Sequence, residues 1–153
     1  MLERPMDAVE VVQFAPEDLE VCLGLWAEAV AITYAFLSDE AIQHQRKVVA
    51  RLSGVDTYIA RVRGLVVGFV SINNFSLLGL FVTPAFQRRG IGKALVEHVA
   101  QCAPRLSVVV YQSNIGALAF YRKLGFDMTD VRNMDGDGFP YPVFEMRRGI
   151  WDA

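Results

Sequence analysis

The feature that most constrains the fold is a stretch of 24 residues, 64–87, that contains no Asp, Glu, Lys, Arg or His. Of these residues, 14 are Ala, Val, Ile, Leu or Phe, so the stretch belongs either in a membrane or inside a protein core. A membrane-spanning helix needs about 20 mainly apolar residues in a row. Here the run is broken by Gly68, Asn73, Gly79 and Pro84, which are typical of turns and strand ends. The stretch therefore predicts two or three strands in the interior of a sheet.

The composition predicts one cytoplasmic domain that spans residues 1–153. A length of 153 residues, 53% of them hydrophobic, is enough for a single core. The formal net charge is −2 and no long basic stripe occurs, so we expect neither nucleic acid nor a membrane as a partner. The N-terminus also lacks the basic-then-apolar pattern of a signal peptide. The oligomeric state stays open, a homodimer included.

The two cysteines point to no metal site. Cys22 and Cys102 lie 80 residues apart in apolar segments and have no metal-ligand spacing. Such cysteines are typical of buried free thiols in a reduced compartment. We therefore expect both side chains to be buried.

Apolar periodicity predicts an α/β fold of about seven strands. Strands are expected over residues 9–14, 57–63, 65–72, 76–82, 106–111, 126–131 and 143–146. Helices are expected from Pro16 with the buried stripe Leu19, Leu23, Trp26 and Val30, over 38–52, over 91–102, and from Ser113 or Asn114 to Gly125. The run 106–111 is continuously apolar, which is typical of a strand buried on both faces.

The segment after the strand 76–82 predicts an anion site. Its residues are Gln87, Arg88, Arg89, Gly90, Ile91, Gly92 and Lys93, and they lead into a helix. Unpaired first-turn N–H groups and the positive helix end attract an anion, and the two glycines let a ligand approach the backbone. The segment matches neither the Walker A motif nor the dinucleotide fingerprint, so we expect a diphosphate held chiefly by backbone. The alternative is that Gly90 and Gly92 only allow close helix packing and the arginines are solvated.

A second motif follows the strand 106–111. It consists of Asn114, Ala117, Phe120, Tyr121, Gly125 and Phe126. Both motifs in this order resemble the GNAT superfamily of N-acetyltransferases, whose loop Q/R-x-x-G-x-G/A binds the diphosphate of acetyl-CoA. The resemblance implies a mixed, mainly antiparallel sheet flanked by helices. Segments 33–38 and 140–142 are similar to those of small bacterial members of unassigned substrate.

The resemblance also implies roles for individual residues. Leu80, Phe81 and Val82 would pair with the pantetheine arm, and the N–H of Val82 would hold the developing oxyanion. The amides of residues 88–93 would hold the diphosphate. Asn114 would bond the pantetheine and Tyr121 would protonate the leaving thiolate. The alternatives are a plain helix cap at Asn114 and a core aromatic at Tyr121.

The general base is harder to place. Similar family members often carry a Glu just before this strand segment, where the present sequence has Leu77, Leu78 and Gly79. The remaining candidates are Tyr34, Asp39, Glu40, His44 and Tyr141, of which we expect Tyr34 and Tyr141 to line the acceptor pocket. The acidic residues Asp127, Asp130, Asp135 and Asp137 could attract a cationic amine, although turn and edge chemistry is the interpretation we favour.

The expected function is transfer of an acetyl group from acetyl-CoA, as cosubstrate, to a primary amine of a small molecule, peptide or protein. No Cys or Ser with a base partner suggests a covalent intermediate, so transfer in a ternary complex is expected. The alternatives are a non-catalytic acyl-CoA-binding module, a different acyl group, or an oxygen acceptor.

Overall fold

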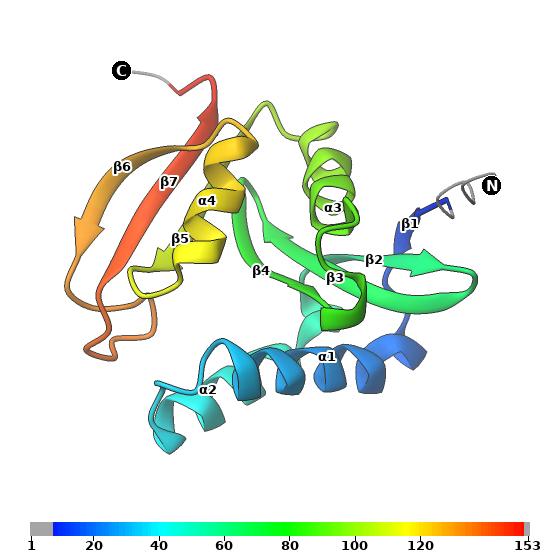
Figure 1. The fold of residues 1–153 in the computed structure, drawn as a ribbon, viewed down its shortest axis with the longest axis horizontal. Helices are drawn as coiled ribbons and strands as arrows, with labels where there is room; N and C mark the ends of the chain where they lie inside the picture. The colour runs from blue at the N-terminus through cyan, green and yellow to red at the C-terminus, as the bar shows by residue number, and fades with distance from the viewer. Residues whose placement is uncertain (1–7, 152–153) are drawn as a thin grey trace, which may run out of the picture.

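The computed structural model describes residues 8–151 (Figure 1). The strands are β1 (Glu10–Gln13), β2 (Asp56–Val62), β3 (Leu65–Asn73), β4 (Ser76–Val82), β5 (Arg105–Tyr111), β6 (Asp127–Arg132) and β7 (Val143–Gly149). The α-helices are α1 (Leu19–Ile32), α2 (Asp39–Val49), α3 (Ile91–Ala100) and α4 (Ile115–Lys123), with 3-10 turns at Pro16–Asp18, Leu52–Gly54 and Pro84–Phe86. The uncharged stretch thus forms β3, β4 and the turn that leads toward α3, as predicted.

The strands form one sheet in the order β1-β2-β3-β4-β5-β7-β6. All neighbours are antiparallel except β4 and β5, which are parallel. This confirms a mixed, mainly antiparallel sheet of seven strands. The β4–β5 register joins only Ser76 to Ser107 and Leu77 to Val108, so the two strands diverge beyond these pairs. The sheet is therefore open at its centre (Figure 1).

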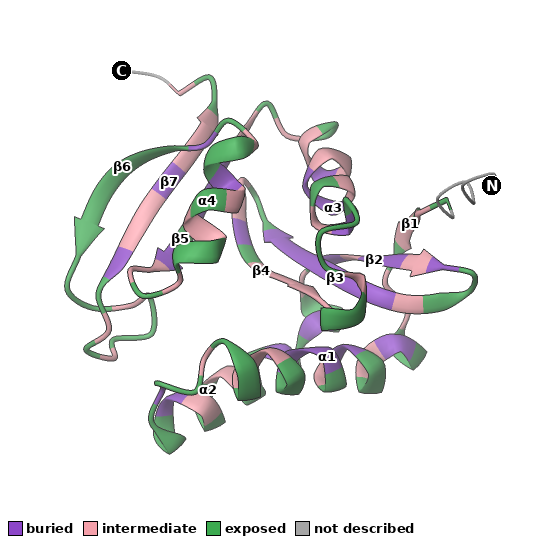
Figure 2. Cartoon of the chain, viewed as in Figure 1, coloured by how far each residue is buried: buried purple, intermediate pink, exposed green. Residues whose placement is uncertain are grey.

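Helices pack on both sides of the sheet and form two apolar clusters. Residues of α1 and α2 pack with Ile59 and Phe69 on one face. Residues of α3 and α4 pack on the other face with β2 to β5, and this cluster includes Leu95 and Tyr121. Most of β3 is buried, whereas β6 is exposed along its whole length (Figure 2).

Two expectations about burial were wrong. Cys102 is exposed because α3 ends at Ala100 and the cysteine lies beyond it. Val109 of β5 is 42% exposed because it lies on the face opposite α4, so β5 is not buried on both faces. In α1, the buried side chains are Cys22, Leu25 and Trp26; Trp26 of the predicted stripe is thus buried, and Leu19, Leu23 and Val30 are partly buried and pack against the same cluster. Burial raises the pKa of the Cys22 thiol to about 12, so this group stays protonated.

Within residues 8–151, no helix has the length and apolar character that crossing a membrane requires. Residues 1–5, which carry the expectation about a signal peptide, lie outside the described residues.

Candidate active site

The opening between β4 and β5 exposes the backbone of one strand edge. The N–H of Thr83 donates to the carbonyl of Val67 on β3 at 2.9 Å. Because antiparallel pairs alternate between bonded and non-bonded, the N–H groups of Leu80 and Val82 point away from β3, into the opening. The Gln87 side chain donates to the Val82 carbonyl at 3.2 Å on this same edge. The edge can therefore accept an extended ligand as a further strand.

The loop before α3 places backbone amides beside this opening. Gly90 is the N-cap of α3 with a φ of 80°, and Arg88 also has a positive φ of 63°. The first intrahelical bond is donated by Ala94 to Gly90, so the N–H groups of residues 91–93 precede the helical ladder. The guanidinium of Arg89 lies over the Phe86 ring, 5.1 Å from its centroid.

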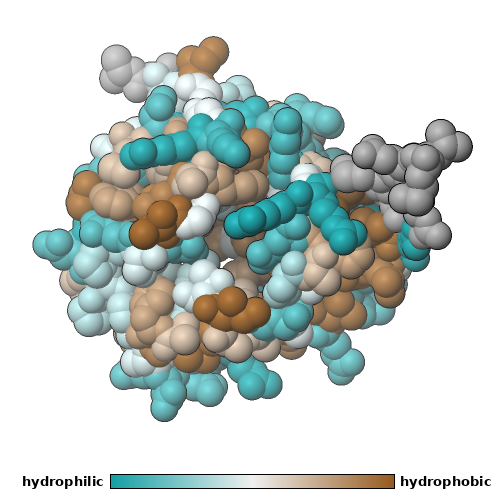
Figure 3. All heavy atoms as spheres, in the orientation of Figure 1, coloured by the Kyte–Doolittle hydropathy of each residue, from teal (hydrophilic) through white to brown (hydrophobic). Residues whose placement is uncertain are grey.

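The two glycines of the loop have different roles. Nothing lies within 4 Å of a Cβ built on Gly90, so its positive φ is the reason for glycine there. A Cβ on Gly92 would lie 3.0 Å from Cζ of Phe120, so this glycine lets α4 approach α3. Close helix packing, the alternative raised for both positions, therefore applies to Gly92. Figure 3 shows a hollow near the centre of this face, where β4 and α4 face each other in Figure 1, with hydrophilic side chains beside it.

Tyr121 projects from α4 into the core beside the opening. Its side chain is 6% exposed and packs edge-on against Phe120 and Phe126, with ring centroids 5.1 Å and 5.2 Å away. Burial, and secondarily the neighbouring Tyr34, raise the pKa of the Tyr121 phenol above its ordinary value. The phenol therefore keeps its proton at neutral pH, so this proton is available to be donated.

Asn114 joins α4 to the loop between α1 and α2. Its Oδ1 accepts from the N–H of Ala117 at 3.2 Å, which is the helix cap anticipated for it. Its Nδ2 donates to the Tyr34 hydroxyl at 3.4 Å. Burial raises the pKa of Tyr34, and the bond from Asn114 acts in the opposite direction. Tyr34, in the α1–α2 loop, thus connects this loop to α4 through Asn114 and to β4 through Phe81.

Four aromatic rings contact one another in a chain and are called here the aromatic cluster: Tyr34, Phe36, Tyr111 and Tyr141. Their neighbouring centroids are 5.4–6.2 Å apart and their contacts are edge-to-face. The Tyr34 ring also lies 6.5 Å from that of Phe81 on β4. The Tyr141 hydroxyl accepts from the N–H of Ser38 at 2.7 Å. The fold therefore brings together the two predicted acceptor tyrosines, and adds Phe36 and Tyr111, which the sequence did not single out.

The position before Leu80 cannot hold a carboxylate without rearrangement. A Cβ on Gly79 would lie 2.9 Å from Cε2 of Phe81, so the Phe81 ring covers the glycine. The ring in turn contacts Phe69 and Tyr34. At Gly79, one of the three positions where relatives carry the carboxylate, the Phe81 ring thus occupies the space that a side chain would need.

The other base candidates are placed differently. Asp39 and Glu40 are exposed in the first turn of α2. His44 of α2 lies 3.2 Å from Asp137 in the loop between β6 and β7. The four predicted acidic residues do not form one cluster. Asp127 and Asp130 lie on β6, whereas Asp135 and Asp137 lie in the β6–β7 loop, beside the aromatic cluster and α2.

Among residues 8–151, no three His, Cys, Asp or Glu side chains come together as metal ligands would. The chemistry available to the described site is that of backbone amides, phenols and carboxylates.

Several known proteins are similar to this chain. A family model described as "Acetyltransferase (GNAT) domain" matches residues 53–128. The chain is 32% identical to the peptidyl-lysine N-acetyltransferase YjaB of Escherichia coli over 132 residues, which cover 85% of this chain and 90% of that protein. It is 34% identical to the peptidyl-lysine N-acetyltransferase YiaC of Escherichia coli over 126 residues, covering 80% and 86%.

Solved structures share the fold. The solution structure of apo YjaB from Escherichia coli superimposes with a TM-score of 0.81 at 30% identity and covers 92% of this chain and 97% of that one. The PaiA N-acetyltransferase of Thermoplasma acidophilum, solved in complex with coenzyme A, has a TM-score of 0.73 at 23% identity and covers 94% and 99%.

Proposed function

Because this chain belongs to the GNAT family of N-acetyltransferases, we propose that it transfers the acetyl group of acetyl-CoA directly to a primary amine in a ternary complex. The observation that carries this proposal is the opening between β4 and β5. Its strand edge leads to the amides before α3 on one side, and Tyr34 connects it to the aromatic cluster on the other. Donor and acceptor can thus meet there.

For the donor, the amides of residues 88–93 hold the diphosphate, assisted by the charges of Arg88, Arg89 and Lys93. The edge formed by Leu80, Phe81 and Val82 pairs with the pantetheine, and the N–H of Val82 polarises the thioester carbonyl. Gln87 supports this edge through its bond to Val82. One Nδ2 hydrogen of Asn114 donates to the Tyr34 hydroxyl, and the other is left to donate to the pantetheine amide.

For the chemistry, the acceptor ammonium first loses one proton. The neutral nitrogen then attacks the thioester carbon, the N–C bond forms and the C–S bond breaks. Tyr121 gives its proton to the departing thiolate, the nitrogen releases its second proton to water, and Tyr121 regains a proton from water. Since a lysine-like amine has a pKa of about 10.4, its deprotonation at neutral pH costs ~4–5 kcal/mol, so a proton acceptor near the amine is useful.

For the acceptor, the ε-amine of a peptide lysine is the substrate we favour. YjaB and YiaC are both named peptidyl-lysine N-acetyltransferases. The aromatic cluster offers π-faces that attract an alkylammonium group. Tyr34 and Tyr141 line this acceptor side, where Tyr141 also fixes the loop at Ser38.

The function is tested by thiol release from acetyl-CoA in the presence of lysine peptides, free amines and peptide N-termini. Thiol release with one of these acceptors supports acetyl transfer. Binding of coenzyme A without turnover on any acceptor would identify a non-catalytic acyl-CoA-binding module instead. Propionyl- and succinyl-CoA in the same assay measure acyl preference.

Coenzyme A is expected to stabilise the protein. A ligand that binds only the folded state at 100 times its Kd adds about 2.7 kcal/mol to the free energy of unfolding. The measurement is the melting temperature with and without coenzyme A. No shift at saturating concentration would contradict the donor site.

Replacing Tyr34 or Tyr141 by Phe is expected to raise the KM for the amine several-fold and to leave stabilisation by coenzyme A nearly unchanged. Tyr141→Phe removes the acceptor of the Ser38 bond and loosens the α1–α2 loop, at a cost of about 1 kcal/mol. The measurements are steady-state kinetics for the amine and melting with coenzyme A. An unchanged KM and turnover in both variants would remove these tyrosines from the acceptor site.

A further inference from the structure

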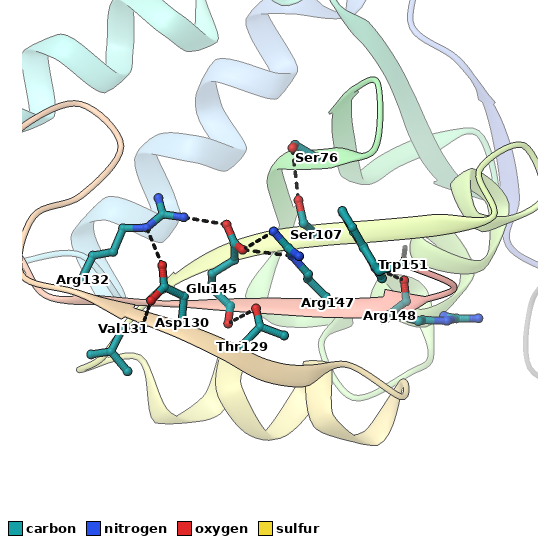
Figure 4. Close-up of polar contacts among 10 residues, drawn as sticks. All are labelled: Ser76, Ser107, Thr129, Asp130, Val131, Arg132, Glu145, Arg147, Arg148 and Trp151. Carbon is teal, nitrogen blue, oxygen red and sulfur yellow. Dashed lines mark hydrogen bonds and ion pairs between the residues drawn. The ribbon is translucent and has the colours of Figure 1, made fainter. Parts of the chain in front are cut away.

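Two of the carboxylates near the face of β5 and β7 that bears Tyr111, Glu145 and Asp135, differ in their partners. Glu145 of β7 accepts from Arg132 at 2.6 Å and lies 3.0 Å from a guanidinium nitrogen of Arg147 (Figure 4). Its charge is therefore already balanced by two cations. Asp135, in the loop between β6 and β7, contacts a phenol instead.

The carboxylate of Asp135 divides its two oxygens between a turn and a tyrosine. Its Oδ1 accepts from the backbone N–H groups of Asp137 at 3.0 Å and Phe139 at 2.9 Å. Its Oδ2 accepts from the Tyr111 hydroxyl at 3.1 Å. The first oxygen fixes the loop, and the second is directed at the aromatic cluster.

The direction of the Tyr111 proton follows from its other neighbours. Trp26 can only donate, and its indole N–H donates to Oε1 of Gln45 at 3.1 Å. This leaves Nε2 of Gln45 to donate to the Tyr111 oxygen at 3.2 Å. Since a carboxylate only accepts, the Tyr111 proton lies on the bond to Asp135. The chain Trp26–Gln45–Tyr111–Asp135 is thus polarised toward the carboxylate.

Tyr111 also lies where an ammonium group is expected to bind. Its ring centroid is 5.4 Å from Phe36, 5.8 Å from Tyr34 and 6.1 Å from Tyr141. Phe36 is 41% exposed, so an acceptor can reach this surface from solvent. Aromatic faces attract cations. The carboxylate of Asp135, which accepts a hydrogen bond from the Tyr111 hydroxyl, adds negative electrostatic potential at this surface.

We propose that Tyr111 contacts the acceptor ammonium and takes its first proton while passing its own proton to Asp135, in place of the carboxylate that β4 lacks. This inference rests on the proposed function. One N–H bond of the ammonium breaks and an O–H bond forms at Tyr111, while the former Tyr111 proton forms an O–H bond on Oδ2 of Asp135. The products are a neutral amine, a neutral tyrosine and a carboxylic acid that later releases its proton to water.

The physical environment favours this exchange. Burial, and then the Asp135 charge, raise the pKa of Tyr111, so the phenol is neutral before the amine arrives. When an acceptor covers the cluster and excludes water, an ammonium and a carboxylate are both disfavoured relative to their neutral forms. A transfer that neutralises both is then less unfavourable than in water. Here Tyr111 is the catalytic residue, and Asp135 positions its hydroxyl.

Other titratable groups around this pair belong to identified neighbours. Tyr34 is bonded by Asn114 and Tyr141 by Ser38. His44 pairs with Asp137, and Glu145 with its two arginines. Of these groups, Asp137 makes no bond to Tyr111 and its charge is the smallest of the causes that raise the Tyr111 pKa, so its removal is a control for a change of charge nearby.

The test uses the full-length protein with the substitutions Asp135→Asn, Tyr111→Phe and Asp137→Asn. In Asp135→Asn, the amide oxygen can still accept the two backbone bonds of the turn, while the charge is removed and the oxygen that accepts from Tyr111 is replaced by an N–H donor. Tyr111→Phe keeps the ring. Asp137→Asn removes the same charge two residues away and serves as the matched control. The acceptors are a lysine peptide and the same peptide with S-aminoethylcysteine, whose amine is more acidic and nearly the same shape.

At about pH 7, Asp135→Asn and Tyr111→Phe are expected to lower kcat/KM for the lysine peptide by about 100-fold, the range of general-base catalysis. The loss should shrink as the pH approaches the pKa of the amine, ~10.4, and should be smaller for the more acidic amine. Asp137→Asn should stay close to wild type, and stabilisation by coenzyme A should be unchanged in all three.

An equal loss at every pH and for both peptides, or no loss, would overturn the inference, because a merely structural role affects all amines alike. An equal effect of Asp137→Asn would do the same. If wild type releases no thiol with any acceptor, the proposed function itself fails, and this outcome is visible before any variant is compared.

Discussion

Replacing Tyr121 by Phe is expected to lower turnover by about 100-fold or more while the fold and binding of coenzyme A persist. The change removes one hydroxyl and keeps the ring that packs between Phe120 and Phe126. Loss of a general acid typically costs about 100- to 10,000-fold in rate. The effect therefore falls on the step in which the thiolate leaves, and stability should change by no more than about 1 kcal/mol.

The energetics of proton transfer permit this role. A phenol with a pKa of about 10 donates to a thiolate with a pKa of about 8.5 at a cost of ~2 kcal/mol. Burial raises the pKa of Tyr121, which makes it a weaker acid. The same dry environment also disfavours the thiolate, so the difference between the two groups changes less than either pKa does.

The measurement is thiol release at saturating acceptor, combined with melting in the presence of coenzyme A. Tyr58→Phe is the matched control, since this half-buried tyrosine of β2 packs at a tilt against His98, with ring centroids 4.7 Å apart, and takes no part in the proposed site. If Tyr121→Phe turns over like Tyr58→Phe, another group must protonate the thiolate.

Gly90→Ala is expected to weaken binding of coenzyme A at least about 10-fold, whereas Gly64→Ala is not. Gly90 has a φ of 80° and Gly64, in the β2–β3 turn, a φ of 79°, and neither has atoms within 4 Å of an added Cβ. An alanine in this region costs roughly 1–2 kcal/mol, so both variants should lose similar stability. At Gly90, a backbone shift that relieves the strain also reorients the first N–H groups of α3, whereas a shift at Gly64 does not.

The two variants are compared by denaturant unfolding and by titration with coenzyme A. Equal losses of unfolding free energy with unequal losses of affinity would show that the α3 N-terminus binds the diphosphate. Equal affinities for coenzyme A would place the diphosphate elsewhere.

Local features of the sequence were sufficient to predict β4, the loop before α3 and the ends of α4, which form the proposed donor site. The strand predicted over 76–82 is β4 with the same bounds, because Asn73 and Asn74 on one side and Pro84 on the other limit it. Asn114 caps α4 and Gly125 ends it with a φ of 91°, as short-range capping rules predict. The loop before α3 depends on the same kind of information, since helix starts are encoded within a few residues.

Exposure was less predictable because it depends on what covers each face. Val109 belongs to an apolar run, yet α4 covers only one face of β5. Cys102 follows the apolar positions of α3 in sequence, but the helix ends before it. The hydrophobicity of a residue does not tell which helix or strand packs against it.

The sequence by itself determined that residues 64–87 are strands leading to a loop and helix, because charge-free strands and glycine-marked turns follow local rules. Only the tertiary structure decided how the proposed acceptor side is built. Inserting β7 between β5 and β6 brings the loop of Asp135 and Tyr141 beside the end of β5, where Tyr111 meets the α1–α2 loop. The rings of the aromatic cluster come from three distant segments, so only the packed sheet brings them together.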